Sequence, residues 1–560
     1  MISPLEQLIT YIADALAYDQ EQPLIFTRLF FWGFFAVVLL GYAAVYNRIN
    51  ARTLYLLAAS FFFYYKTSGV FLVLLIFTII SDYNWGRLMA SSTQAWKRKF
   101  FLTCSVVLNL SLLCYFKYAY FFAENISVIT GKELHFVNHF SQFSNTWLGT
   151  SFSVDKLILP IGISFFTFQS LSYTIDIYRD RVKPVKHIYD YGFFVCFFPH
   201  LVAGPIVKAH DFLYQIYQKY TLTQLEFGMA LFWILNGLGK KIMADYVGVN
   251  YVDRIFDNPG YYSGLEVVLG IFGYSLQIYA DFSGYTDIAI GIALLLGFRL
   301  KTNFLSPYKA ASTSEFWKRW HISLSSWLKE YLYIPLGGNR KGTIGSYMAI
   351  SVLSFVLVLL SGNFFWFWVI AAAALVLFIL ARLFPPFRHS VNTNINILLT
   401  MLLGGLWHGS SWMFIIWGGL NGVGLMIHKG WERISPFGTG VTGHKLYRAM
   451  AMLLTLIFIS FTRIWFRSNN LQTVDVIFDR MWNHFGGELL FHVINGYAAV
   501  ISVMALGYLI HWIPESVKEG YRHWFASRPL PFMALLTVLV VFVLYQAVSA
   551  DMQPFIYFQF

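Results

Sequence analysis

Charged residues and cysteines are both scarce in this sequence. Only 12% of its 560 residues are Asp, Glu, Lys or Arg, whereas a soluble domain carries about 25%. No polar stretch is long enough to form a separate soluble domain. The cysteines lie in apolar segments and lack the spacing of a disulfide framework or a metal site: Cys104, Cys114 and Cys196. The shortage of charge excludes a soluble enzyme, and we expect the cysteines to be packing residues.

Acidic residues are the scarcer charge sign, with 28 Asp and Glu against 40 Lys and Arg, so the net charge is +12. The basic residues gather in loops, as the positive-inside rule expects. They form no basic domain interleaved with aromatic residues, which excludes nucleic acid as a partner. Residues 1–23 contain four acids and no Lys or Arg, unlike a cleavable signal peptide. Apolar residues within 5–16 repeat at helical spacing, which predicts a helix lying on the membrane surface.

Hydrophobic residues dominate the composition, at 57%. Long apolar runs predict an all-α polytopic membrane protein with roughly 10 to 13 transmembrane or re-entrant helices. The predicted parts are N-terminal membrane helices with the surface helix (1–150), a central core (151–430) and C-terminal membrane helices (431–560). The C-terminal spans are predicted near 447–466, 494–513 and 530–549. Arg463 and Arg467 flank Trp465, which is the pattern of ordinary interfacial anchors.

The loop 306–342 carries six basic residues against two acids, which predicts that it faces the cytosol. Ser312 and Glu315 have the spacing of a capping box, so we expect a helix to begin there. The periodicity predicts an amphipathic helix at the cytosolic rim of the membrane. Its apolar face comprises His321, Leu324, Leu328 and Tyr331. His321 is therefore predicted to point into the protein.

His408 stands in an apolar stretch, 20 residues from Arg388 and 21 from Lys429, its nearest charged neighbours. At about 1.5 Å per helical residue, it lies near the middle of a hydrocarbon slab about 30 Å thick. An ionisable side chain is costly at that depth and normally serves a function there. A solitary intramembrane histidine can equally be a hydrogen-bond partner in helix packing. On residue chemistry alone, a reaction centre and a packing role both remain open.

Five segments of the chain resemble the membrane-bound O-acyltransferase (MBOAT) family in the right order. They are FFPHLVAGPIVK (197–208), QIYADFSGYTDIAIGIALLLGF (277–298), NFLSPY (303–308), EFWKRWHISLSSWLKEYLYIPLGGNR (315–340) and LLGGLWHGSSW (402–412). The likeness is closest to the bacterial alginate O-acetyltransferase branch, with the D-alanyl transfer proteins of teichoic acid more distant. It covers most of 155–430, which identifies the central part as an MBOAT-like catalytic core.

The resemblance implies that His408, in the WHG motif, is catalytic and that His321 is the second signature residue. A neutral imidazole can deprotonate a hydroxyl that attacks a thioester, and burial keeps a histidine neutral. We therefore hypothesise that His408 is the general base, while His321 orients the donor or polarises the thioester carbonyl. Cations predicted to hold the phosphates of the donor are Lys318, Arg319, Arg340 and Lys341. Candidate tunnel-lining residues are Asp281, Tyr285, Asn303, Trp407 and His200.

Two acidic residues of this central part also have a structural interpretation. Asp281 and the neighbouring Asp287 are expected to pair with Arg299 or to form a structural hydrogen bond. No third ligand accompanies the two histidines at metal-site spacing, so no metal is expected.

The spacing of the two histidines departs from the alginate-type pattern. They lie 87 residues apart, and the relatives place them closer together. The extra length is an apolar hairpin within 345–385, with arms predicted at Tyr347–Leu360 and Phe364–Leu383. Two added crossings preserve the sidedness of the pair. The insertion indicates a different lateral wall, acceptor or partner surface.

The resemblance implies an enzyme of the bacterial cytoplasmic (inner) membrane. It would move an acyl group, acetyl above all, from a cytosolic acyl-CoA or acyl-carrier thioester to a cell-envelope or exported polysaccharide, with no bound cofactor. An extracytoplasmic SGNH-hydrolase-like acyltransferase is the implied partner. The alternatives are a D-alanyl-type or lipid O-acyltransferase, and a transporter or flippase without acyl chemistry. A transporter would tolerate His408→Gln, whereas an acyltransferase would not.

Overall fold

The structure, a computed structural model, describes residues 16–19, 23–134, 137–147, 149–150, 159–435 and 445–548. Every regular element in this part of the chain is a helix, which confirms the all-α prediction. The predicted surface helix over 5–16 lies almost wholly outside the described residues.

A buried carboxylate joins two helices of the N-terminal part. The elements of this part are α2 (Leu29–Val45), α3 (Ile49–Ser68), η1 (Gly69–Phe71), α4 (Leu72–Ser91), α5 (Ala95–Leu113), the π-helical η2 (Cys114–Tyr118), α6 (Ala119–Thr130) and α7 (His139–Trp147). On α4, Asp82 is fully buried. Its oxygens accept hydrogen bonds from Ser105 Oγ (2.6 Å) and Asn109 Nδ2 (2.8 Å) on α5. These bonds satisfy the carboxylate and tie α4 to α5.

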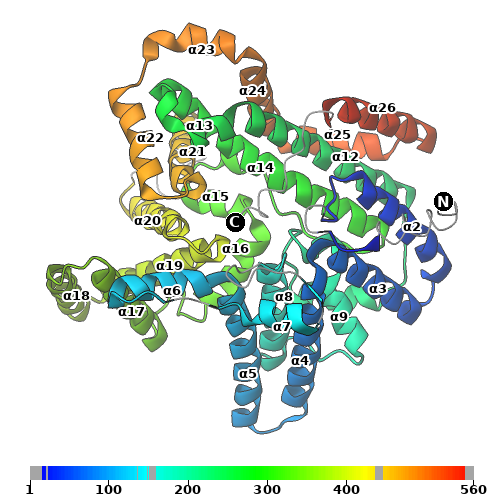
Figure 1. Cartoon of the computed structure of the whole chain (residues 1–560), viewed down its shortest axis with the longest axis horizontal. Helices are drawn as coiled ribbons and strands as arrows, with labels where there is room; N and C mark the ends of the chain where they lie inside the picture. Colours follow the sequence, from blue (N-terminus) through cyan, green and yellow to red (C-terminus); the bar gives the residue numbers. More distant parts are fainter. Residues whose placement is uncertain are drawn as a thin grey trace.

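The central part contains the motif segments (Figure 1). Its first half comprises α8 (Ile163–Tyr178), α9 (Ile188–Cys196), α10 (Phe198–Leu201), α11 (Ala209–Ile216), α12 (Gln224–Val247), η3 (Gly248–Val252), α13 (Asp253–Asp257), η4 (Pro259–Tyr261) and α14 (Gly264–Leu295). Its second half comprises η5 (Pro307–Lys309), α15 (Thr313–Arg319), α16 (Ile322–Leu328), η6 (Lys329–Tyr333), α17 (Ile344–Leu360), α18 (Phe365–Leu383), α19 (Pro385–His408) and α20 (Trp412–Ile434).

In the described residues, the C-terminal part contains two helices followed by two bent pairs. Its elements are α21 (Lys445–Arg467), α22 (Leu471–Asn483), η8 (Gly487–Leu489), α23 (Leu490–Gly496), α24 (Ala498–Trp512), α25 (Glu515–Ala526) and α26 (Leu530–Val548). Helix α21 confirms the span predicted near 447–466. The segments predicted near 494–513 and 530–549 are helical, but each joins the preceding helix at a bend, of 92° and 114° respectively.

By length and composition, five helical segments of the described chain can cross a membrane, or seven if each bent pair counts as one span. This is fewer than the 10 to 13 crossings and re-entrant pieces predicted. The inner helices explain part of the difference. Helices α12 and α19 have 24 residues each, long enough to span, but they carry polar side chains that face other helices instead of lipid.

Helices α12 and α14 form the centre of the molecule through close backbone contact and buried ion pairs. A Cβ atom on Gly237 would lie 2.5 Å from the carbonyl oxygen of Gly284, so only glycine permits this approach. Lys240 Nζ lies 2.6 Å from Asp287 Oδ2, and Lys241 Nζ lies 2.8 Å from Asp281 Oδ1.

These lysines, rather than Arg299, pair with the two aspartates. The expected Arg299 pairing is wrong because Arg299 extends to Glu226. The periodicity of the sequence does not indicate whether an aspartate pairs with a cation on a neighbouring helix or with one nearby in the chain.

Helices α19 and α20 pack equally closely around the WHG motif. A Cβ on Gly405 would lie 2.2 Å from the carbonyl oxygen of Phe414, and one on Gly418 would lie 2.3 Å from that of Met401. These glycines bring the two backbones together where α19 ends, and they fix the position of the motif histidine.

The inserted hairpin lies at the edge of the molecule. Helices α17 and α18 project beside the start of α19 (Figure 1), and their bounds match the predicted arms within a few residues. No residue of α18 is buried. The hairpin is therefore a peripheral addition to the core and leaves α14, α16 and the end of α19 undisturbed.

Candidate active site

The chain breaks at His321. Ser312 caps α15 by accepting a hydrogen bond from Glu315 N, as predicted. However, α15 ends at Arg319, and His321 has φ 42° and ψ 55° before α16 begins at Ile322. The single amphipathic helix predicted through this segment is therefore wrong, although the inward orientation of His321 is confirmed, because its side chain is 0% exposed.

Asn303 holds this left-handed turn in place. Its backbone carbonyl accepts a hydrogen bond from Ile322 N (2.9 Å), and its side-chain Oδ1 accepts one from Ser323 N (3.1 Å). Oδ1 also lies 3.2 Å from His321 Nδ1. These bonds join the NFLSPY segment to the start of α16, so the turn depends on a residue 18 positions earlier in the chain.

The same contacts determine the tautomer of a neutral His321. A backbone N–H can only donate, so the Asn303 atom facing Ser323 N must be the amide oxygen. His321 Nδ1 faces this oxygen and must therefore carry the proton. The lone pair then resides on Nε2, which is buried and has no hydrogen-bond partner among the described residues. The fold thus presents His321 as a proton acceptor.

His408 is the last residue of α19 and is 4% exposed. Its ring makes edge contacts with three aromatic rings, with centroid distances of 5.0 Å to Trp407, 5.0 Å to Trp417 and 5.3 Å to Phe466. This enclosure fixes the imidazole and excludes bulk water. The predicted depth of His408 in the membrane stays a prediction.

Trp407 connects the two histidines. Its ring centroid lies 6.0 Å from that of His321 and 5.0 Å from that of His408. It also stacks on Phe168 of α8, at 5.5 Å, and Phe168 stacks on Trp327 of α16, at 3.8 Å. His321 lies near enough to His408 to interact with it electrostatically. The structure therefore brings His321, Asn303, Trp407 and His408 into one buried cluster.

Lys117 is a contributor that the sequence did not reveal. It lies in the π-helical turn between α5 and α6, and its Nζ donates to the backbone carbonyls of Trp407 (2.5 Å) and His408 (3.2 Å). A cation at the C-terminus of α19 satisfies carbonyls that lack helical partners and complements the helix dipole. The only indication in the sequence was a single lysine within an apolar run. Because ionisable residues inside a membrane usually have a function, its position could have identified it as a candidate site residue.

Arg463 is a second buried cation near His408, and the prediction for it is wrong. It was predicted to be an interfacial anchor, but it is 1% exposed. Its guanidinium lies over the ring of Trp320 at 4.3 Å and near that of Phe466 at 5.6 Å. It interacts electrostatically with His408. Arg467 pairs instead with Asp253 and Asp257, so the two arginines have different surroundings.

Three predicted tunnel residues lie elsewhere. Asp281 pairs with Lys241. Tyr285 stacks on Phe26 at 4.5 Å. His200 is fully buried, with Nε2 3.0 Å from the carbonyl oxygen of Phe194, which is a packing role. From the same stretch of α14, Phe282 is the residue whose ring meets His321, at 4.7 Å.

The four predicted donor-binding cations lie on two separate segments of the chain. Arg319 pairs with Glu315 of its own helix at 2.8 Å, and Lys318 beside it is exposed. Arg340 and Lys341 are exposed in the loop after η6. Helices α16 and η6 separate the two pairs along the chain.

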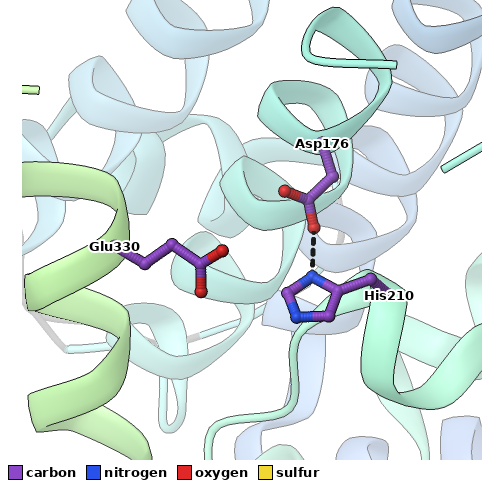
Figure 2. Close-up of side chains that lie close together, drawn as sticks. All are labelled: Asp176, His210 and Glu330. Atoms are coloured by element: carbon purple, nitrogen blue, oxygen red, sulfur yellow. Dashed lines mark hydrogen bonds and ion pairs between the residues drawn. The ribbon is translucent and has the colours of Figure 1, made fainter. Parts of the chain in front are cut away.

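A different polar cluster lies on the side of the core that is predicted to face the cytosol. Figure 2 shows Asp176 at the end of α8, His210 on α11 and Glu330 on η6 turned toward one another. His210 Nδ1 donates to Asp176 Oδ2 at 2.7 Å. This hydrogen bond raises the pKa of His210, although partial burial alone would lower it.

Two cations complete this cluster. Lys208 Nζ lies 2.7 Å from Glu330 Oε2, and Arg181 pairs with the other oxygen. Burial alone would raise the pKa of Glu330, but its hydrogen bond with Lys208 and the positive charges around it outweigh burial and lower the pKa. Arg181 and Lys208 therefore meet the segment 306–342, which is predicted to face the cytosol, at Glu330.

The cluster could be considered for metal binding, because ligand atoms of Asp176, His210 and Glu330 lie within 4.8 Å of one another. Those atoms are already engaged. Asp176 Oδ2 accepts hydrogen bonds from both His210 and the hydroxyl of Tyr331 (2.9 Å), and both oxygens of Glu330 face cations. The donor set fits a network of hydrogen bonds and ion pairs better than a metal centre.

Comparison with known proteins agrees with the motifs. A sequence model described as MBOAT, membrane-bound O-acyltransferase family, matches residues 101–388. His408 lies beyond this match.

Several relatives extend the match along the chain. A protein named "Probable alginate O-acetylase AlgI" from Azotobacter vinelandii is 36% identical over 68% of this chain and 63% of its own length. A peptidoglycan O-acetyltransferase from Helicobacter pylori is 32% identical over 80% of this chain and 77% of its own length. The Pseudomonas putida protein named "Probable alginate O-acetylase AlgI" is 31% identical over 91% of this chain and 94% of its own length. The chain therefore belongs to the membrane-bound O-acyltransferase family and is a multi-pass membrane O-acyltransferase.

Proposed function

We propose that this enzyme moves an acetyl group from a cytosolic thioester donor across the membrane for O-acetylation of a cell-envelope or exported polysaccharide. Relatives covering most of the chain are named for O-acetylation of alginate and of peptidoglycan, which are both polysaccharides. The observation that carries the proposal is the buried pair of His321 and His408 on one tryptophan, inside a membrane protein of an acyltransferase family.

His408 is assigned as the general base. The attacking hydroxyl forms a C–O bond with the thioester carbonyl carbon while its proton passes to a histidine, and the C–S bond breaks. The histidine then returns the proton to the thiolate that leaves. Enclosure by aromatic rings disfavours a charged imidazole, so His408 is neutral and ready to accept a proton before each cycle.

The structure supports a changed role for His321. With Nδ1–H held by Asn303, its free Nε2 is an acceptor and cannot donate a hydrogen bond to a carbonyl oxygen. We assign it to accept a hydrogen bond from the hydroxyl or the thiol. Carbonyl polarisation then falls to the buried cation Arg463, which already interacts with the His408 region.

The donor approaches from the cytosolic side. Lys318, Arg319, Arg340 and Lys341 remain candidates for the phosphates of coenzyme A or of a phosphopantetheine arm. Lys208 and Arg181 add positive charge beside Trp327 and Tyr331, the residues that lead inward to the stacked rings of Phe168 and Trp407. A phosphate chain could be bound at either basic region.

The cellular setting follows from the bacterial relatives. We place the enzyme in the bacterial inner membrane, with the donor on the cytosolic side and the polysaccharide on the other. An extracytoplasmic SGNH-hydrolase-like acyltransferase is the proposed partner, since the resemblance implies a separate protein that completes transfer to the glycan.

Mild base treatment of cell-envelope glycans tests the proposal. Cells carrying the intact protein and cells carrying His408→Ala, matched for protein level in the membrane, would be compared by mass spectrometry of the released acyl groups. Loss of released acetate in the variant is expected. Loss of D-alanine would identify an alanyl transferase instead, and an unchanged acyl profile would contradict the acyltransfer reaction on glycans.

A further inference from the structure

A large cavity lies between the inserted hairpin and the first half of α19. Its volume is about 810 Å³, and its walls are mostly apolar side chains of α17, α18 and α19. Volumes of this size are typical of sites for whole small molecules. The cavity is remote from His408, because α19 contributes only residues from its first turns, up to Ile395.

The chemistry of the cavity differs between its two ends. Near the turn of the hairpin, the lining residues are apolar, among them Val358, Phe367 and Ile370. At the opposite end, Arg382 and Arg388 join the lining. Neither arginine pairs with a carboxylate in the part of the chain that the structure describes.

A polar bridge closes the wall at this basic end. The hydroxyl of Tyr347, in the first turn of α17, donates to Asn392 Oδ1 of α19 at 2.6 Å. Both residues line the cavity. This end adjoins the loop 306–342, which the charge pattern places on the cytosolic side of the membrane. The two arginines therefore lie at the depth of lipid headgroups, and the apolar walls extend from there into the hydrocarbon.

We propose that this cavity binds an anionic phospholipid, with its phosphate at Arg382 and Arg388 and its acyl chains along α17 and α18. An apolar slot open to the bilayer is filled by hydrocarbon chains, and two uncompensated cations at the headgroup level attract a phosphate. The bound lipid replaces protein contacts that the hairpin lacks, since α18 buries no residue against the protein.

Charge complementarity favours a lipid over a second protein. A transmembrane helix docked in the cavity would have to present acidic side chains to both arginines near the membrane surface. A second copy of this chain would bring another pair of positive charges to the same place. A phosphate-bearing lipid supplies the negative charge and the apolar chains in one molecule.

Native mass spectrometry of delipidated protein mixed with phosphatidylglycerol or phosphatidylcholine tests the site. The intact protein is expected to retain phosphatidylglycerol preferentially. Changing both Arg382→Gln and Arg388→Gln should weaken its binding roughly 10- to 30-fold, since each basic residue near a membrane surface contributes about fivefold. Lys97→Gln, an exposed basic residue far along the chain on α5, is the charge control.

Two alanine-to-tryptophan variants distinguish lipid binding in the cavity from lipid binding elsewhere on the protein surface. Both Ala374 and Ala372 are exposed on α18, but only Ala374 lines the cavity. Ala374→Trp should reduce retained lipid, and Ala372→Trp should not, with thermal unfolding of both proteins checked. Equal retention of the two lipids, equal behaviour of the two alanine variants, or a dimer that only Ala374→Trp disrupts would each overturn the proposal.

Discussion

The two ends of α19 place polar side chains in opposite surroundings. At its C-terminus, His408 is enclosed by three aromatic rings and is 4% exposed. At its N-terminus, Arg388 and Asn392 line an open cavity beside a hairpin that buries little of itself. The comparison teaches that a membrane enzyme can enclose an ionisable group completely where its chemistry occurs and leave cations open where lipid can supply the counter-charge.

The two ends are also held by different means. Glycine contacts with α20, the Lys117 side chain and stacked rings fix the histidine end. The hairpin end is joined by two side-chain hydrogen bonds between α17 and α19, Tyr347 to Asn392 and Ser346 to Asn396, and by apolar contacts that leave a cavity. Substitutions at equivalent distances from the middle of α19 should therefore have very different effects.

Replacing histidine at each end of α19 gives the largest expected contrast. His408→Gln removes the general base and should lower acyl transfer by about 10²- to 10⁴-fold, with the protein still folded. His389→Gln, in an exposed position at the other end, should leave the rate unchanged. Base-released acetate per unit of membrane protein measures both. Comparable activity of the two variants would remove His408 from the chemistry.

Replacing one asparagine near His321 and one at the hairpin end of α19 gives a second contrast. Asn303→Ala frees the His321 ring and allows the other tautomer, so we expect a 10- to 100-fold loss of activity, as for other residues that orient a functional imidazole. The pH–rate profile should also change, which a purely structural defect would not cause. Asn392→Ala, at the hairpin end, should retain activity. An unchanged profile for Asn303→Ala would show that it does not position His321.

Glycine substitutions test the packing that fixes the active end. Gly405→Ala places a Cβ 2.2 Å from a backbone oxygen of α20, and we expect it to destabilise the protein by about 1–3 kcal/mol. Gly430→Ala, where nothing lies within 4 Å, should be neutral or slightly stabilising. Thermal unfolding in detergent compares them. Equal midpoints would mean that α19 and α20 can separate without cost.

The smallest expected effect concerns the polar cluster of Asp176, His210 and Glu330. The pKa of His210 is raised by Asp176, so its stabilising contribution is complete below the ordinary value of about 6.5 and is lost as pH rises through the folded-state value. The pKa of Glu330 is lowered, so Glu330 stays ionised over the pH range in which His210 loses its proton.

Hydrogen exchange of α11, corrected for intrinsic rates, should therefore be faster at about pH 8.5 than at about pH 6. His210→Asn should remove this difference. Persistence of the pH dependence in that variant would assign it to another group.

Apolar runs predicted the peripheral elements well. The hairpin arms were expected at Tyr347–Leu360 and Phe364–Leu383, and the helices are Ile344–Leu360 and Phe365–Leu383. The bounds of lipid-facing helices follow from local hydrophobicity, which can be read from consecutive residues of the sequence. The same reasoning singled out His408, because the nearest charged residues, Arg388 and Lys429, are 20 and 21 positions away.

The details of the site could not be predicted because they depend on distant residues. The break at His321 requires Asn303 to hold a left-handed turn, whereas local periodicity favoured a continuous helix. Arg463 has the sequence surroundings of an interfacial anchor, and only tertiary packing on Trp320 shows its burial. Lys117 reaches α19 across 290 positions of the chain, a contact that no spacing rule anticipates.

The central claim is that His321 and His408 act together at one site. The most direct measurement compares acyl transfer by His321→Gln, His408→Gln and the double variant, using membranes supplied with isotopically labelled acetyl-CoA and counting base-labile label in glycan. If the histidines act as a unit, the double variant should be no slower than the slower single variant. Losses that multiply in the double variant would show independent roles and contradict the shared site.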